Sequence, residues 1–246
     1  MSGHSKWHSI KHKKAAADSK RGKMFTKIIR EIQVAARIGG GDLTSNPRLR
    51  NIVSEAKSIN MPKDNIEKAI KKGTGELEGS TYEEKSYEGY GPGGVAILIQ
   101  TLTDNGNRTT AEIRHLFSRC NGNLGTSGSV AWMFERKGII VLDSTKYKEE
   151  QIFDMIIDAN VDNIETDGEE IIITTPPENF EPAKKILESN NIEIISSKLE
   201  FIAKNKTDID VETAKKLANL VDKFEEHDDV QNVYFNADIP DEALEG

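Results

Sequence analysis

The spacing of apolar residues changes near residue 80, and this change limits the folds open to the chain. Between residues 22 and 75, apolar side chains recur every three or four residues in three runs. Such runs predict three short amphipathic helices that can bury their apolar faces only against one another. We expect Asn46 to cap the second helix and Gly73 to end the third. The sequence therefore predicts a helical domain over residues 22–79.

Beyond residue 80, β-rich runs alternate with helical runs. Residues 136–204 show the order strand, helix, strand, strand, helix, strand, which is typical of a ferredoxin-like domain. Residues 80–135 and 205–246 supply further strands and helices, but neither segment can close a sheet alone. We expect them to pack together as a middle domain into which 136–204 is inserted. The predicted fold is α/β (α+β): an N-terminal three-helix domain, then two ferredoxin-like α+β domains, the last inserted into the middle one.

The charges are divided as unevenly as the apolar residues. Residues 1–75 hold 17 Lys and Arg against 6 Asp and Glu, a balance of +11, whereas the rest of the chain balances −19. Between Ser2 and Gly22 only Trp7 and Ile10 are large and apolar, so we expect residues 1–21 to form a flexible basic tail. A basic end on an acidic body predicts contact with a polyanion at that end.

Several absences narrow the class of protein. The sequence has no apolar run of about 20 residues and no secretory signal, so we expect no membrane partner. Cys120 is the single cysteine, which excludes an internal disulfide and favours a reducing, cytoplasmic location. No set of nucleophile, base and oxyanion donors is apparent, so no catalytic residue, enzymatic activity or cofactor is expected.

The basic start predicts nucleic-acid binding. Lysines neutralise phosphates, and aromatic side chains such as Trp7 stack on unpaired bases, a mode typical of looped or single-stranded RNA. The predicted nucleic-acid contacts are His4, Lys6, Trp7, Lys11, His12, Lys13, Lys14, Lys20, Arg21, Lys23, Lys27 and Arg30. The alternative is a solvated tail that only aids solubility. His4, His8 and His12 would share one helical face, but no fourth ligand is visible, so no metal site is expected.

Two internal motifs have both a structural and a functional interpretation. Residues 89–94 fit G-x-G-x-x-G, but a β-rich run follows them instead of a helix, so we expect a hairpin turn and no dinucleotide. Residues 104–110 precede a helix whose N-terminus would attract phosphate, with a plain helix cap at Asn107 as an equal alternative. The candidate phosphate contacts are Asn105, Asn107, Arg108 and Arg114.

Three more segments carry expectations. The glycine-rich loop 121–129 would either approach a nucleic-acid backbone or connect two strands. Residues 130–134 are expected to form a strand with Trp132 in the core. An acidic cluster is expected as a solvated helix end, and it comprises Glu225, Glu226, Asp228 and Asp229.

Five segments closely resemble the YebC/PmpR family, in the same order from Ser2 to about Asn236. They are GHSKWHSIKHKKAAADSKRGKMFTKIIREI, GYGPGGVAILI, TDNGNRTTAEIRHLF, GSVAWMFERKG and DDVQNVYFN. The resemblance implies a three-domain α/β protein without enzymatic activity that regulates gene expression. The family's basic motif falls on His4, Lys6, Trp7, Lys11, His12, Lys13 and Lys14.

The resemblance also suggests partners. Members of the family are described as DNA-binding transcriptional regulators, whereas others resemble translation factors that act on ribosomes, including a mitochondrial branch. The start of this chain is similar to the bacterial branch. The expected partner is rRNA or tRNA within the ribosome, or duplex DNA, together with ribosomal proteins. We favour RNA because its unstacked bases can accept Trp7.

Two other functions stay open. A protein–protein adaptor would act through the acidic α+β domains and would not need residues 2–21. A hydrolase would gather Asp104, Arg108 and Arg114 in a deep cleft between domains.

Overall fold

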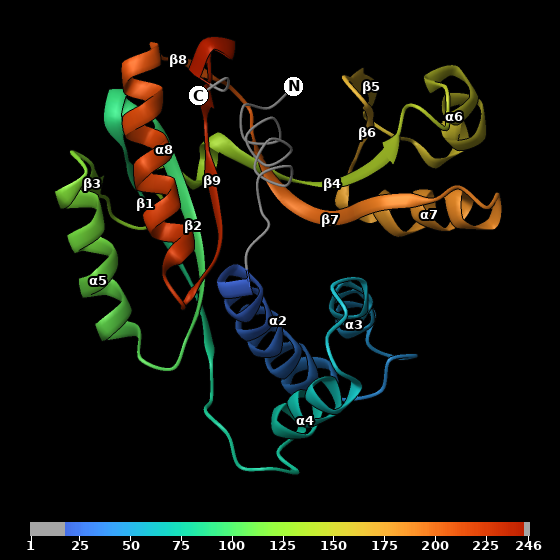
Figure 1. The fold of residues 1–246 in the computed structure, drawn as a ribbon, viewed down its shortest axis with the longest axis horizontal. Coiled ribbons are helices and arrows are strands. Elements are labelled where there is room, and N and C mark those ends of the chain that lie inside the picture. Colours follow the sequence, from blue (N-terminus) through green and yellow to red (C-terminus); the bar gives the residue numbers. More distant parts are fainter. Residues whose placement is uncertain (1–17, 244–246) are drawn as a thin grey trace.

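Three helices form the N-terminal part of the molecule in the computed structural model, which describes residues 18–243 and the side chains of residues 22–240, 242 and 243 (Figure 1). They are α2 (Asp18–Gly39), α3 (Pro47–Ser58) and α4 (Lys63–Thr74). Their apolar faces meet in one buried cluster around Ile32, Leu49 and Ala69, which confirms the predicted three-helix arrangement. The first helix already begins at Asp18, inside the segment expected as a tail.

The side chain of Asn46 connects two of these helices. The Asn46 side chain accepts a hydrogen bond from the Leu49 backbone N–H at 3.0 Å and donates one to the Ala35 carbonyl at 2.9 Å. The predicted cap of α3 is therefore confirmed, and the same side chain ties α3 to α2.

The expected end of the third helix at Gly73 was wrong. Helix α4 continues to Thr74 and ends at Gly75, whose φ of 84° only glycine adopts readily. Gly73 is part of the helix, and it lies close to α2. A Cβ at this position would lie 2.4 Å from the Gln33 carbonyl oxygen, so close packing explains the glycine. The glycine serves helix packing and not helix termination.

A four-stranded sheet follows, with the order β3-β1-β2-β9. Its strands are β1 (Glu83–Tyr90), β2 (Ala96–Thr103), β3 (Asn123–Leu124) and β9 (Val230–Phe235). A short 3-10 turn, η1 (Pro92–Gly94), joins β1 to antiparallel β2, which confirms the predicted hairpin. Helices α5 (Gly106–Arg119) and α8 (Val211–Glu226) pack on one face, where Phe117 and Phe224 contact each other. Because β9 pairs with β2, segments on both sides of residues 136–204 share this sheet.

A second antiparallel sheet has the order β5-β6-β4-β7. Its elements, in chain order, are β4 (Phe134–Asp143), α6 (Glu149–Ile156), η3 (Ile157–Ala159), β5 (Asn163–Asp167), β6 (Glu170–Thr175), α7 (Pro177–Ser189) and β7 (Ile194–Ala203). The predicted succession of strands and helices is confirmed. Helices α6 and α7 bury one face of the sheet, around Ile140, Ile173 and Leu187.

The long strands β4 and β7 connect the two sheets (Figure 1). Phe134 at the start of β4 packs with Leu98 and Tyr234 on the face of the first sheet that α5 and α8 leave open. The ring of Phe201 in β7 lies 5.6 Å from that of Tyr234. The short strands β8 (Thr207–Asp208) and β10 (Ala237–Asp238) pair in parallel, and η4 (Asp241–Ala243) follows. None of the described helices has the length and apolar character needed to cross a membrane.

The strand expected over residues 130–134 was wrong, as was the core position of Trp132. A 3-10 turn, η2 (Ala131–Met133), occupies this segment, and the strand starts only at Phe134. Val130 and Phe134 are buried, whereas Trp132 is 62% exposed. The turn directs the two flanking side chains into the core and the indole between them to the surface.

Candidate nucleic-acid interface

The predicted contacts divide into three groups by their place in the structure. The family motif, His4 to Lys14, lies outside the described residues. Lys20 and Arg21 belong to the first turns of α2, but their side chains are outside the described part of the chain. Lys23, Lys27 and Arg30 are described in full, so the structure bears directly on these three only.

Lys23, Lys27 and Arg30 share one face of α2, because they are spaced four and three residues apart. This face lies against the end of α8. Lys23 Nζ donates to the Glu226 carbonyl at 3.2 Å, and Lys27 Nζ donates to the Glu225 carbonyl at 2.9 Å. Carbonyls at a helix C-terminus carry partial negative charge and lack partners within the helix, so they attract these cations.

Arg30 reaches further, into the turn before β9. Its Nη1 donates to the Asp228 carbonyl at 2.6 Å and to Asp229 Oδ1 at 2.7 Å, and its guanidinium lies 5.1 Å from the centre of the Tyr82 ring. The side chain is only 14% exposed. Arg30 therefore links the helical part of the molecule to the first sheet.

Asp229 is the centre of this junction. It is buried, which corrects its expected place in a solvated acidic cluster. Its second oxygen accepts hydrogen bonds from Arg108 Nη2 at 2.8 Å and from Thr109 Oγ1 at 2.6 Å. Burial alone would raise the pKa of Asp229, but the hydrogen bonds from Thr109, Arg108 and Arg30 lower it below its usual range. The carboxylate is charged and fully used in binding the chain's own groups.

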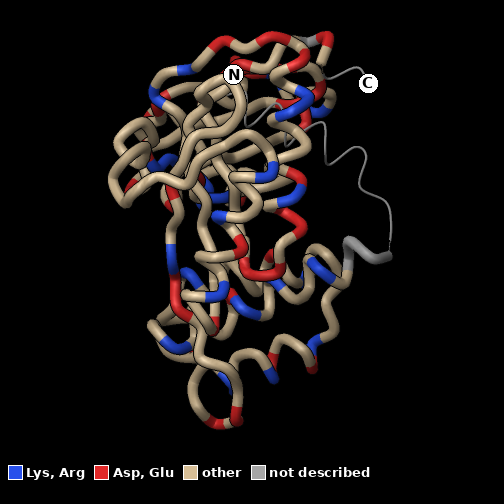
Figure 2. Tube along the Cα trace, turned by 90° about the vertical axis from the view of Figure 1, so that its left-hand side faces the viewer, with Lys and Arg blue, Asp and Glu red and all other residues tan. Residues whose placement is uncertain are grey.

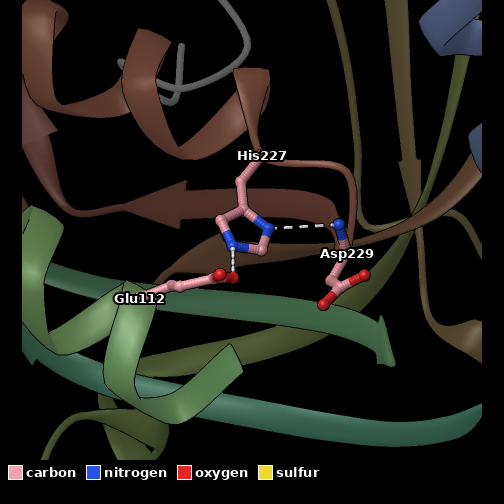
Figure 3. Close-up of side chains that lie close together, drawn as sticks. All are labelled: Glu112, His227 and Asp229. Atoms are coloured by element: carbon pink, nitrogen blue, oxygen red, sulfur yellow. Dashed lines mark hydrogen bonds and ion pairs between the residues drawn. The ribbon is translucent and has the colours of Figure 1, made fainter. Parts of the chain in front are cut away.

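His227 and Glu112 extend the network, as Figure 3 shows. The Asp229 backbone N–H donates to His227 Nδ1 at 3.1 Å, so His227 Nε2 carries the proton that it donates to Glu112 Oε2 at 2.7 Å. Sequence reasoning missed this cluster, because Glu112 and His227 are 115 positions apart and no spacing pattern connects them.

The same three residues include the types that bind metal ions, and their candidate ligand atoms lie within 4.8 Å of one another. Their hydrogen bonds argue against a metal. His227 Nδ1 already accepts the Asp229 N–H, and the Asp229 carboxylate already binds Arg30 and Arg108. A divalent cation would meet two guanidinium groups at close range, which is electrostatically unfavourable. We interpret the cluster as a hydrogen-bond network that holds the junction.

Three of the four candidate phosphate contacts, Asn105, Asn107 and Arg108, lie at the start of α5. Asn105 is its cap, since Asn105 Oδ1 accepts the Arg108 backbone N–H at 3.1 Å. The expected cap at Asn107 was wrong, because the chain becomes helical at Gly106 and leaves Asn107 exposed in the first turn. The Arg108 guanidinium binds Asp104 at 2.9 Å as well as Asp229, and these contacts raise its pKa further above its usual value.

The expected hydrolase residues are only partly gathered. Asp104 and Arg108 form an exposed ion pair one helical turn apart. Arg114 lies farther along α5 with its side chain exposed. This arrangement shows a surface pair and not a nucleophile with its base.

The surface charge keeps the division seen in the sequence. Residues 22–75 carry 11 Lys and Arg against 5 Asp and Glu, whereas residues 76–243 carry 16 against 34. In Figure 2 basic residues recur along the helical part at the bottom of the view, and acidic residues predominate along the top edge. The described helices therefore continue the basic character of the segment that precedes them.

Comparisons with known proteins place the whole chain. A model described as the TACO1/YebC protein N-terminal domain matches residues 5–76, and one described as the TACO1/YebC second and third domain matches residues 82–237. A "probable transcriptional regulatory protein" of Desulforapulum autotrophicum is 51% identical over 245 residues, covering 100% of this chain and 99% of that protein. A protein of the same name from Treponema pallidum is 52% identical over 244 residues, covering 99% and 100%.

A solved structure agrees with the fold. The crystal structure of a conserved hypothetical protein from Aquifex aeolicus superposes with a TM-score of 0.83 at 46% identity, covering 91% of this chain and 92% of that one.

Proposed function

The chain belongs to the TACO1/YebC family, and on this basis we propose that it is a non-enzymatic regulator of gene expression that binds nucleic acid through its basic N-terminal segment. The observation that carries the proposal is the concentration of nine Lys and Arg against one acid in residues 1–30, in a chain whose remainder beyond residue 75 balances −19. Such a division concentrates the neutralisation of phosphates at one end of the chain.

We assign different roles to the two parts of the basic segment. Lys23, Lys27 and Arg30 are engaged with residues 225–229 of the same chain, so they orient α2 and contribute little to binding. The contacts to phosphates and bases come from His4, Lys6, Trp7, Lys11, His12, Lys13 and Lys14, and are joined by Lys20 and Arg21. The family model for the N-terminal domain begins at residue 5 and so includes nearly all of them.

RNA is the proposed ligand, within the ribosome or as a structured rRNA or tRNA. Lysine-rich segments bind phosphates without reading sequence, and an indole such as Trp7 gains stacking energy only from bases that are not already stacked. Loops of RNA offer such bases, whereas duplex DNA does not. The names of the relatives favour DNA, so duplex DNA is the competing ligand.

A side-by-side titration distinguishes the two ligands. Fluorescently labelled duplex DNA, a structured RNA of equal phosphate number and purified ribosomes would be titrated with the full chain at several salt concentrations. The proposal predicts tighter binding to the RNA and the ribosomes at each salt concentration. Equal or tighter, sequence-dependent binding to the duplex would overturn the RNA assignment but retain nucleic-acid binding.

A protein adaptor is the second candidate, because Phe153 in α6 (47%) and Ile157 at the start of η3 (54%) are exposed four residues apart on the acidic body. It predicts that deleting residues 2–21 leaves the regulatory effect in cells intact. Our proposal predicts that the deletion abolishes this effect.

We also propose the division of the chain that the sequence suggests: residues 22–79, residues 80–135 with 205–246, and an inserted ferredoxin-like domain at residues 136–204. Three separate buried clusters support it. Limited proteolysis tests it, with the first cuts expected near residues 76–82 and near 204–206.

A further inference from the structure

Trp132 is exposed in a position where the chain buries its neighbours. The side chain is 62% exposed, although Val130 and Phe134 on either side are 0% and 4% exposed. A large aromatic ring left in water forgoes a substantial gain from burial, and such rings are enriched where another molecule covers them.

The indole is held in a fixed position by its own loop. Trp132 Nε1 donates to the Ser129 carbonyl at 3.1 Å, and the Tyr90 hydroxyl donates to the same carbonyl at 3.2 Å. The polar edge of the ring is therefore satisfied within the chain, and its apolar faces remain for a ligand. A preorganised ring loses little conformational entropy on binding.

Glu88 fixes the loop that carries Trp132. This buried carboxylate accepts hydrogen bonds from the backbone N–H groups of Gly128, Val130 and Ala131, each at 2.7 Å. Burial alone would raise the pKa of Glu88, but these three donors lower it below its usual range, so the carboxylate is charged at neutral pH. The C-terminal end of the glycine-rich loop therefore has a fixed conformation, because its backbone N–H groups are bound by the charged Glu88 carboxylate.

Two exposed basic residues lie near Trp132 along the backbone. The Lys204 backbone N–H donates to the Met133 carbonyl at 2.9 Å, which places Lys204 across from the residue after Trp132. Lys204 is exposed, and no ion pair of its side chain is seen with the described residues. Arg136 is exposed farther along β4. An aromatic face beside a cation is the arrangement by which proteins bind single-stranded nucleic acid.

We propose that Trp132 and Lys204 form a second nucleic-acid contact, in which an unpaired RNA base stacks on the indole and the neighbouring phosphate meets the lysine. The inference rests on the proposed function and extends it, because it places a base-stacking site on the sheet part of the molecule, away from the N-terminal segment. Glu88 is a positioning residue for this contact, because it binds the backbone of the loop that carries Trp132 and does not itself touch the base.

Tryptophan fluorescence tests the contact directly. The chain has two tryptophans, so a Trp7→Phe variant keeps an aromatic ring at position 7 and leaves Trp132 as the only reporter. The probes are a labelled 12-nucleotide single-stranded oligoadenylate and an abasic oligonucleotide of equal length. The expected result is quenching of Trp132 by the first probe and none by the second.

Affinity gives the second readout. Trp132→Ala should weaken oligoadenylate binding by about 5- to 150-fold, the range of one lost stacking contact, whereas Trp132→Phe should retain most of the affinity. The exposed aromatic Phe153 supplies the matched control, and Phe153→Ala should leave affinity unchanged. Because Trp132 is exposed, Trp132→Ala should keep the melting temperature of the parent chain, which excludes misfolding as the cause.

The outcomes separate this inference from the proposed function. If the parent chain binds neither RNA nor ribosomes, the proposed function fails and this contact fails with it. If the chain binds RNA, but Trp132 is not quenched and Trp132→Ala binds equally well, only this contact is overturned. Loss of ribosome attachment in Trp132→Ala with unchanged oligoadenylate affinity would also overturn it, in favour of a protein partner.

Discussion

At the scale of single residues, Asp229 shows how one buried carboxylate can organise a junction. It receives Arg30 from α2, and Arg108 and Thr109 from α5, so one charge joins two helices to the turn before β9. A buried ion that loses its counter-ion leaves the remaining charges without compensation. The two arginines would then keep only backbone carbonyls, the Tyr82 ring and the exposed carboxylates of Asp104 and Glu112 as partners.

Replacing Asp229 with Asn should lower the free energy of unfolding by about 2 kcal/mol at pH 7, less than the value for a fully buried pair because Arg108 is 44% exposed. Urea denaturation measures this change. The control is Asp104→Asn, which removes an exposed partner of the same arginine and should cost about 0–1 kcal/mol. Equal effects of the two variants would contradict the role assigned to Asp229.

The pH dependence of the Asp229 contribution follows from its lowered pKa. The folded state holds the carboxylate in its charged form more strongly than the unfolded state does. The stabilisation is therefore present above the unfolded pKa of about 3.9 and is lost as the pH falls through the lower folded value. Asp229→Asn should accordingly destabilise the protein at pH 7 and have a much smaller effect near pH 2.

At the scale of elements, the packing of α2 against α4 depends on a glycine. A Cβ at Gly73 would lie 2.4 Å from the Gln33 carbonyl oxygen and 2.7 Å from the Ala36 Cβ, and both neighbours belong to the buried side of α2. The Gln33 backbone and the Ala36 side chain cannot make room for a Cβ at position 73 unless α2 and α4 move apart.

Gly73→Ala should therefore destabilise the protein by about 1–3 kcal/mol, despite the higher helix propensity of alanine. The matched control is Gly22→Ala, because Gly22 is also helical but a methyl group added there would meet no atom within 4 Å. That variant should stabilise the protein by up to about 1 kcal/mol. Thermal melting of both variants checks the prediction, and a shift of the same sign in both would contradict it.

A second junction brings α2, α3 and β7 together. Burial, first, and the nearby Glu55 raise the pKa of Glu31 to about 7, while Lys198, Arg48 and Lys27 oppose the rise. Lys198 binds Glu55 at 2.6 Å, so one lysine serves more than one carboxylate. A carboxyl group with a raised pKa stabilises the fold fully below its unfolded value of about 4.5, and this contribution is lost as the pH rises through about 7.

Glu31→Gln should therefore raise the free energy of unfolding by about 2 kcal/mol at pH 8 and by much less at pH 5. The figure is below the full equivalent of the pKa change because Glu31 retains part of its surface in solvent. Chemical denaturation across this pH range measures the difference. Glu67→Gln, on the exposed side of α4, is the matched control for the loss of one carboxylate from the helical domain.

Local sequence patterns predicted most helices and strands, but they did not predict which side chains are buried by contacts with distant parts of the chain. The alternating runs of residues 136–204 predicted the order strand, helix, strand, strand, helix, strand, which β4, α6, β5, β6, α7 and β7 have in the structure. The same reasoning failed for Trp132, because two buried neighbours at positions 130 and 134 fit a strand or a 3-10 turn equally well. It failed for Asp229 because burial there comes from α2, about 200 residues away in the chain.

At the scale of the whole molecule, the main feature is the division of charge. This division was visible in the sequence, because the net charges of residues 1–75 and of the remainder differ in sign. The sequence did not reveal that Lys23, Lys27 and Arg30 are bound by carbonyls and a carboxylate at the end of α8. The contact between α2 and α8 therefore uses part of the basic charge to connect the helices to the sheet, which is why we propose the preceding residues as the nucleic-acid contacts.

The most direct test of this account replaces Lys6, Lys11, Lys13 and Lys14 with glutamine and measures ribosome affinity across salt concentration. We expect affinity to fall at least about tenfold near 0.1 M salt, and the slope of log affinity against log salt to become shallower by about 3, because four phosphate contacts are lost. The matched control changes the same charge on α4, with Lys63, Lys68, Lys71 and Lys72 replaced by glutamine, and should retain most of the affinity. Unchanged affinity and slope in the first variant would contradict the account.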